Sequence, residues 1–184
     1  MSGDRYLDEL VRLMPPPERV FAPTTWEDAE AAIGVQFPDS FKAFLDTYGL
    51  GTIEPELYVM DPRRVDQFAY HARIDSDAVD YLPFEELPAE RRPPYHGFPA
   101  PGRSLLSVAG NGNGDRLYIV VDNGAAIDDE LWINDKSDWQ RMRGPFCRLL
   151  ADLLAGRNRE ALGRFDYWAW HLEPSFVAAP DSYL

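Results

Sequence analysis

The chain has 184 residues, of which 45% are hydrophobic and 13% aromatic, and its formal net charge is −13. The length suits one ordinary domain with a substantial core, and the composition excludes a disordered or low-complexity chain. The acidity disfavours direct binding to nucleic acid or to anionic membranes, because such binding uses clustered Lys and Arg side chains.

The first part of the chain predicts two helices. Residues 4–14 place apolar side chains at helical spacing, and the prolines at 15–17 end this helix. A second helix is predicted over residues 26–33. The Thr25 hydroxyl can cap its first turn, and Gly34 can adopt the left-handed conformation that ends a helix.

A third helix and two short strands follow. Pro38 suits the first turn of a helix because its missing N–H has no partner there, and Gly49 closes this helix. Residues 52–53 and 57–60 alternate in polarity and predict short strands. The Asp-Pro pair at 61–62 then predicts a cap and a first-turn proline for another helix.

The second half of the chain predicts an antiparallel meander. We expect residues 73–103 to be the least regular part, because carboxylates, prolines and glycines crowd this stretch. Apolar strands are predicted at 104–109, 117–121 and 131–133, joined by turns rich in Asn and Gly. A strong final helix is predicted over 146–155, and a glycine ends it.

Two groups of motifs resemble the SUKH superfamily, which includes fungal cell-wall-assembly regulators and many bacterial immunity proteins that neutralise secreted toxins. The first group has a Trp–x3–acid start, a Gly-x-x-[LF]-Pro centre and a Tyr-Gly-x-Gly end. Its residues are Trp26, Glu30, Ile33, Gly34, Phe37, Pro38, Phe41, Phe44, Leu45, Tyr48, Gly49 and Gly51. The second group follows in the family's order, at Gly114, Asp115, Leu117, Tyr118, Trp132, Trp139, Phe146, Leu149 and Leu150.

The resemblance covers roughly residues 24–156 and implies one α+β domain over residues 1–184. In this fold, N-terminal helices pack on one face of a mainly antiparallel sheet, and a C-terminal helix completes it. The motif residues are expected to serve as core and turn. The resemblance also implies a protein without a cofactor or catalytic residues, which occludes a toxin domain by stoichiometric binding.

The partner is expected to be a basic protein domain, such as a nuclease, because an acidic surface attracts a cationic partner and speeds its encounter. Plain solubility is the alternative explanation of the charge. The contact surface is predicted on acidic residues outside the motif. These residues are Asp75, Asp77, Asp80, Glu85, Glu86, Asp128, Asp129 and Glu130.

Other chemistry finds less support. Asn111, Asn113, Asp115 and Asp122 imitate the oxygen spacing of a calcium loop, but Arg116 takes the place of the glycine and the flanks predict strands. A structural turn held by the Asp115 side chain is the preferred interpretation. A phosphate cradle would need a following Gly-Lys-[ST], which is missing.

The remaining candidates for catalysis are isolated. The histidines, His71, His96 and His171, lack the spacing of metal ligands, and Ser104 lacks a nucleophile elbow. Cys147 is the single cysteine, which excludes an internal disulfide and a multi-cysteine metal site. It lies among leucines, which predicts a buried thiol. The aromatic tail is expected to pack on the core, with partner binding as the alternative. Its residues are Phe165, Tyr167, Trp168, Trp170 and Phe176.

Three functions remain in consideration. A toxin-immunity protein is the leading one, and a regulatory or scaffold module of a cellular complex is the second. The third is an enzyme or small-ligand protein with a concave pocket. No apolar run approaches the roughly 20 residues that cross a bilayer, and the N-terminus is not typical of a secretory signal, so we expect a cytoplasmic location.

Overall fold

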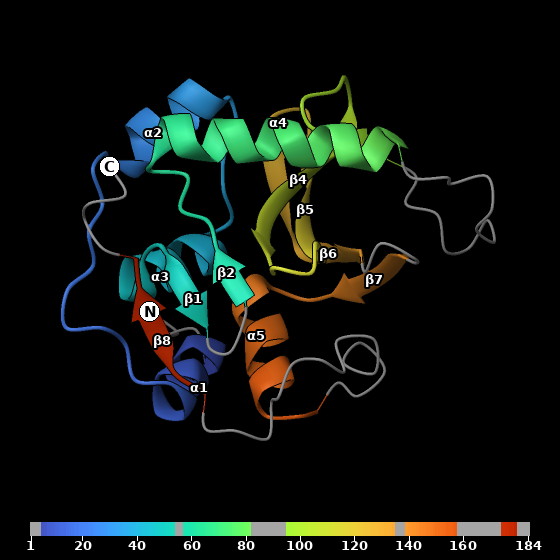
Figure 1. The fold of residues 1–184 in the computed structure, drawn as a ribbon. Helices are drawn as coiled ribbons and strands as arrows, with labels where there is room; N and C mark the ends of the chain where they lie inside the picture. The colour runs from blue at the N-terminus through green and yellow to red at the C-terminus, as the bar shows by residue number, and fades with distance from the viewer. Residues whose placement is uncertain (1–4, 54–56, 82–94, 135–138, 158–173, 180–184) are drawn as a thin grey trace.

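The computed structural model describes residues 5–53, 57–81, 95–134, 139–157 and 174–179, with the side chains of 76–81 left out (Figure 1). The helices are α1 (Arg5–Leu13), α2 (Trp26–Ile33), α3 (Asp39–Tyr48), α4 (Val65–Tyr81) and α5 (Phe146–Leu154). The strands are β1 (Gly51–Ile53), β2 (Leu57–Val59), β3 (His96–Gly97), β4 (Arg103–Gly110), β5 (Arg116–Asp122), β6 (Ala125–Asn134), β7 (Trp139–Arg143) and β8 (Phe176–Ala178).

Both ends of α2, and the end of α3 at Gly49, lie where the sequence predicts. Thr25 is the N-cap of α2, and its Oγ1 accepts a hydrogen bond from the backbone N of Asp28 at 3.1 Å. Gly34 ends α2 with φ +78°, a conformation that favours glycine. Pro38 lies one position earlier than predicted, as the N-cap of α3.

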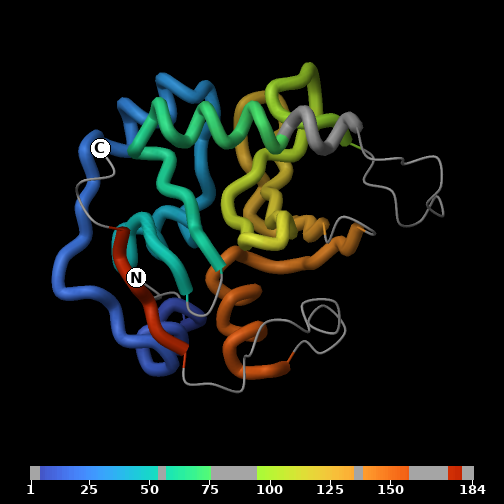
Figure 2. The backbone as a smooth tube through the Cα atoms, in the orientation of Figure 1, coloured from blue at the N-terminus to red at the C-terminus, as the bar shows by residue number. Residues whose placement is uncertain are grey.

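The strands form one mainly antiparallel sheet in the order β7-β6-β5-β4-β2-β1-β8. The run from β4 to β7 is the predicted meander, in which each strand pairs with its neighbour along the chain. β3 pairs with β4 in parallel. Figure 2 shows β8 returning from the far end of the chain to lie beside β1, so that β8 is an edge strand.

The two faces of the sheet carry separate apolar clusters. The larger cluster joins Leu10 of α1, Phe44 of α3, Phe68 of α4 and Leu150 of α5 to alternate residues of the strands. The helices therefore pack on one face, and the protein has the predicted α+β fold. The other face carries a smaller cluster, and its buried residues are Leu105, Tyr118, Val120, Trp132 and Trp139.

The prediction of an irregular stretch from residue 73 was wrong for its first part. α4 continues through residue 81, since the chain from 63 to 82 contains no Gly or Pro that would end a helix. The helix also begins later than its Asp-Pro pair suggests, at Val65. The Asp61 carboxylate accepts a hydrogen bond from the backbone N of Arg63 at 2.9 Å and so closes a turn before the helix.

Only the end of the aromatic tail lies within the described residues. Phe176 packs against the ring of Tyr48 with a centroid distance of 5.2 Å, as expected of core packing. Phe165, Tyr167, Trp168 and Trp170 lie outside the described residues. Among the helices of the described ranges, none is both long and apolar enough to cross a membrane.

Candidate protein-binding groove

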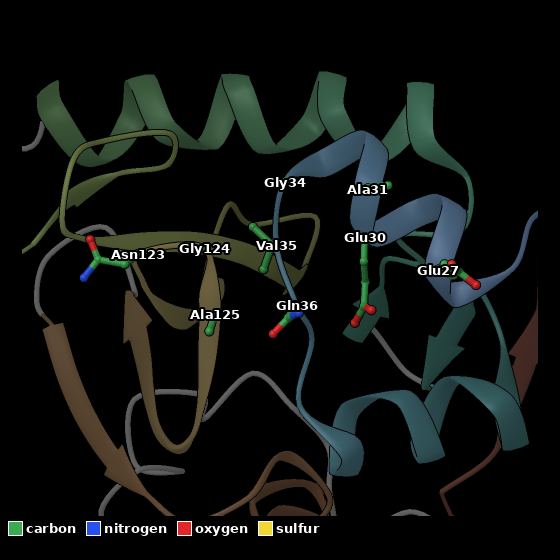
Figure 3. A pocket seen from close by; sticks show the side chains of 9 residues that line it. All are labelled: Glu27, Glu30, Ala31, Gly34, Val35, Gln36, Asn123, Gly124 and Ala125. Carbon is green, nitrogen blue, oxygen red and sulfur yellow. The ribbon is translucent and has the colours of Figure 1, made fainter.

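An open groove of about 560 Å³ separates α2 from the turn between β5 and β6 (Figure 3). It is lined by Glu27, Glu30, Ala31, Gly34, Val35, Gln36, Asn123, Gly124 and Ala125. Its polar side chains are two carboxylates and two amides, and none of the described residues that line it is cationic. We call this site the α2 groove.

Backbone hydrogen bonds fix the floor of the α2 groove. After Gly34 turns the chain, the backbone N of Gln36 donates to the carbonyl of Gly124 at 2.8 Å. The backbone N of Ala126 donates in return to the carbonyl of Gln36 at 2.8 Å. Asn123 and Gly124 both have positive φ, at 50° and 83°, as a tight turn between antiparallel strands requires.

Glu30 is the best-held side chain of the α2 groove. Its Oε1 accepts a hydrogen bond from the backbone N of Phe37 at 2.8 Å and pairs with Lys42 Nζ at 2.5 Å. Figure 3 shows this side chain extending from α2 toward Gln36. Glu27 lies three residues earlier on α2 and is exposed, so that the two carboxylates lie along the same side of the helix.

Two of the predicted contact residues are buried in ion pairs. Asp75 and Glu130 are each 5% exposed. Asp75 pairs with Arg116 at 3.0 Å, and Glu130 pairs with Arg141 at 2.8 Å. Glu130 also accepts a hydrogen bond from Trp132 Nε1 at 3.0 Å. These carboxylates support the sheet and offer little surface to a partner.

The other predicted contact residues fall into two groups. Asp128 and Asp129 are exposed on β6, the strand that begins at the α2 groove. The Asp128 carboxylate accepts a hydrogen bond from Ser40 Oγ at the start of α3. The side chains of Asp77 and Asp80 on α4 lie outside the described residues, as do Glu85 and Glu86.

Most of the family-motif residues are structural. Phe37, Phe41, Phe44 and Tyr48 are buried, and their rings pack against one another or against Phe146. Trp26 also packs against the Phe37 ring, and it belongs in addition to a polar network. Trp26 Nε1 donates to Asp46 Oδ1 at 2.9 Å.

Arg63 is the centre of this network, and the motifs in the sequence do not reveal it. Its guanidinium lies 4.7 Å from the Trp26 ring and pairs with Asp61 at 2.8 Å and with Asp46 at 2.9 Å. It also donates to the carbonyl of Leu45 at 2.8 Å. The only signal in the sequence is the Asp-Pro-Arg run at 61–63. An acidic and a basic residue this close together are common on protein surfaces, so the run does not indicate a buried network.

The glycine-rich turn between β4 and β5 is structural, although it is held differently from the prediction. The Asp115 carboxylate accepts a hydrogen bond from Asn111 Nδ2 at 2.6 Å. The backbone N of Asp115 donates to Asn111 Oδ1 at 2.9 Å. The backbone amide is therefore bound by Asn111 rather than by the Asp115 side chain.

The described residues gather no metal-binding cluster of His, Cys, Asp and Glu. His71 lies on α4 and His96 on β3, while His171 is outside the described residues. Cys147 is a buried free thiol, as predicted, and its Sγ donates to the carbonyl of Ser40 at 3.1 Å.

Helices packed on one face of an antiparallel sheet, with the motif residues in the core and turns, define an α+β protein of the SUKH type. The chain belongs to the SMI1/KNR4 family (SUKH-1), whose model matches residues 22–149 and so covers more than half of it. The resemblance seen in the sequence is confirmed. No curated protein and no solved structure matches the chain. The matched range contains every residue of the α2 groove.

Proposed function

We propose that this protein is a non-enzymatic immunity protein, which neutralises a protein toxin by stoichiometric binding that occludes the toxin's active face. Membership of the SUKH-1 family carries the proposal, because its members are generally immunity proteins or regulators that act by binding other proteins. The toxin domain would be basic, for example a nuclease, since the net charge of −13 favours a cationic partner.

The contact surface in this proposal combines the α2 groove with the exposed carboxylates on β6. Glu27 would receive a Lys or Arg side chain of the toxin, because it is exposed and none of the described residues that line the α2 groove is cationic. Asp128 and Asp129 would extend the same surface along β6. Asp75 and Glu130 would act indirectly, by holding the sheet through their ion pairs.

Co-expression with a toxin encoded beside this gene tests the proposal. We expect the wild-type protein to restore growth and to form a one-to-one complex with that toxin. Glu27→Lys should weaken the complex at least tenfold, since it reverses a charge in the α2 groove. Asp8→Lys is the matched control on α1, which lies far from α2 in Figure 1, and it should still protect. Failure of the wild-type protein to relieve any neighbouring toxin would reject the immunity role.

A regulatory or scaffold module of a cellular complex is the second candidate. The SMI1/KNR4 (SUKH-1) family match is equally consistent with this role, because the family includes cell-wall-related regulators as well as immunity proteins. Affinity capture of a stable cellular complex, at a locus without an adjacent toxin gene, would support the regulatory role over the immunity role.

A further inference from the structure

A second, smaller cavity shares no lining residue with the α2 groove and lies between segments that are distant in the sequence. Its volume is about 220 Å³, and it meets the segment before α2, the end of α3, the start of α4 and the end of β8. The lining residues are Arg19, Val20, Phe21, Tyr48, Gly49, Leu50, Arg64, Ala178 and Ala179. We call it the Arg64 cavity.

Arg64 is buried without a counter-charge in the described part of the chain. Arg64 lines the cavity and is only 6% exposed. Nε and Nη1 are both inaccessible, and no described residue hydrogen-bonds to either of them. The guanidinium lies 5.4 Å from the Phe21 ring, which covers it without accepting a conventional hydrogen bond. The adjacent Arg63, by contrast, has two carboxylates and a carbonyl as partners.

An unpaired guanidinium in this position is energetically unfavourable. Arginine does not deprotonate in proteins, so Arg64 cannot escape the cost of burial by losing its charge. Two features add positive potential. Arg19 lines the same cavity, and the Arg64 carbonyl accepts the hydrogen bond from Phe68 N that opens α4, which places the positive end of the helix dipole nearby. A bound anion would offset this cost.

Size and lining indicate which anion fits. A volume of about 220 Å³ is below the range of roughly 300–1,000 Å³ that is typical of sites for drug-sized ligands. Val20, Phe21, Leu50 and Ala178 make much of the wall apolar. We propose that the Arg64 cavity binds a small aliphatic carboxylate. Its carboxylate would lie on Nη2, since this is the guanidinium nitrogen of Arg64 that is not inaccessible, and its short hydrocarbon stem would lie against these side chains.

Thermal unfolding of the full chain in sodium acetate, propionate and butyrate tests the proposal, with sodium chloride at the same ionic strength as the reference. We expect the melting temperature to rise with carboxylate concentration, and the dissociation constant to fall by about fourfold for each added methylene that the wall covers. Inorganic phosphate should stabilise less, because it has no apolar stem. Equal stabilisation by phosphate, or none by any carboxylate, would overturn the proposal.

Two variants separate a binding role of Arg64 from a structural one. Arg64→Met should abolish the carboxylate-dependent rise, while the ligand-free protein melts no lower than wild type because an unpaired buried charge is removed. Arg143→Met is the matched control, since Arg143 is exposed on β7 at the other edge of the sheet from β8. A large loss of ligand-free stability in Arg64→Met would assign Arg64 to the fold instead.

Side-chain NMR keeps the test independent of the variants. The Nε–H resonance of Arg64 in the wild-type protein should shift during the propionate titration and not during the chloride titration. Asp181 follows Ala179 by two positions in the sequence, and it is the first carboxylate residue after the last residue that lines the cavity. If Asp181→Asn binds propionate more tightly than wild type, the chain's own carboxylate competes for Arg64. This result would overturn the proposal of an external ligand.

Discussion

Arg63 and Arg64 are neighbours with nearly the same burial, at 5% and 6% exposed, yet their surroundings differ completely. Arg63 has its charge and its hydrogen bonds satisfied by the chain, so it belongs to the fold. Among the residues that the structure describes, Arg64 finds no such partner for Nε or Nη1, so it has the environment of a binding residue. The distinction comes from the partners of each guanidinium, and burial alone would not reveal it.

Replacing Arg63 should remove the ion pairs and hydrogen bonds around it and lower the free energy of unfolding. Arg63→Ala leaves Asp61, which is 1% exposed, as an uncompensated buried charge, and we expect a loss of about 3–5 kcal/mol in the free energy of unfolding. Urea denaturation measures this loss. The exposed Arg143→Ala should change stability by about 0.5 kcal/mol or less. The double variant Asp61→Asn with Arg63→Met should recover most of the lost stability. If the effects of the two single substitutions simply add, Asp61 and Arg63 are not coupled.

Tyr48 links stability to alkaline pH. Its hydroxyl donates to the carbonyl of Met14 at 2.7 Å, and burial raises the pKa of Tyr48 well above its usual value. The unfolded tyrosine ionises near pH 10 while the folded one stays neutral. The stability that Tyr48 contributes is therefore full below about pH 10 and declines as the pH rises further.

Tyr48→Phe should thus be less stable than wild type by about 1–3 kcal/mol at neutral pH, because the Met14 carbonyl loses its buried donor. The difference in the free energy of unfolding should narrow above about pH 10. There the unfolded wild type is stabilised by ionisation of Tyr48, which the variant lacks. Tyr118 is also buried with a raised pKa, but it is present in both proteins and cancels. Urea unfolding across this pH range measures the difference, and a constant gap would contradict the assignment.

At the scale of elements, local chemistry predicted the helix ends better than the long-range pairings. The cap at Thr25 and the left-handed Gly34 follow from neighbouring residues alone, and both are confirmed. The pairing of β8 with β1 joins distant segments, and Phe176 gives no local sign of it. The extension of α4 was missed because its carboxylates suggested a loop, although Asp75 has a partner on β5 in Arg116.

The pairing of β1 with β8 depends on the missing side chain of Gly51. A Cβ at this position would lie 2.5 Å from the carbonyl oxygen of Val177, which is backbone and cannot move aside easily. We therefore expect Gly51→Ala to separate β8 from β1 and to disturb the ring contact between Phe176 and Tyr48.

Amide hydrogen exchange at Ala179 reports this separation, because its N–H donates to the carbonyl of Leu50 at 2.9 Å. Overpacking of about 1–3 kcal/mol corresponds to exchange that is roughly 5- to 150-fold faster. Gly112→Ala is the control, since a Cβ at Gly112 would meet no described atom within 4 Å and the variant should exchange as wild type does. Unchanged exchange at Ala179 in Gly51→Ala would contradict the dependence.

For the whole molecule, the sequence predicted the fold class and family but only part of the candidate site. The motif residues identify the family because they make the core and turns that every member needs. Glu30 was recognised as one of them, but its place in the α2 groove depends on the approach of the β5–β6 turn to Gly34. Charge density also drew the contact prediction toward Asp75 and Glu130, whose arginine partners, on β5 and β7, are known only once the strands are paired.

The net charge of −13 should accelerate the encounter with the proposed cationic toxin. Long-range attraction accelerates the encounter of opposite charges and is screened by salt. The association rate constant should therefore fall by about 10- to 100-fold between low and high ionic strength, with a smaller change in the dissociation rate. Stopped-flow mixing of the two proteins over a salt series measures both rates.

Charge-neutral variants locate the charges that matter in this encounter. Glu27→Gln and Asp8→Asn each remove one negative charge. If these charges act only through long-range attraction, the two variants should slow association by similar factors. If the α2 groove receives a cationic side chain, Glu27→Gln should in addition accelerate dissociation, because a close charge pair is lost at the interface. Association that is insensitive to salt would exclude electrostatic steering. Equal dissociation rates for the two variants would show that the toxin contacts a surface other than the α2 groove.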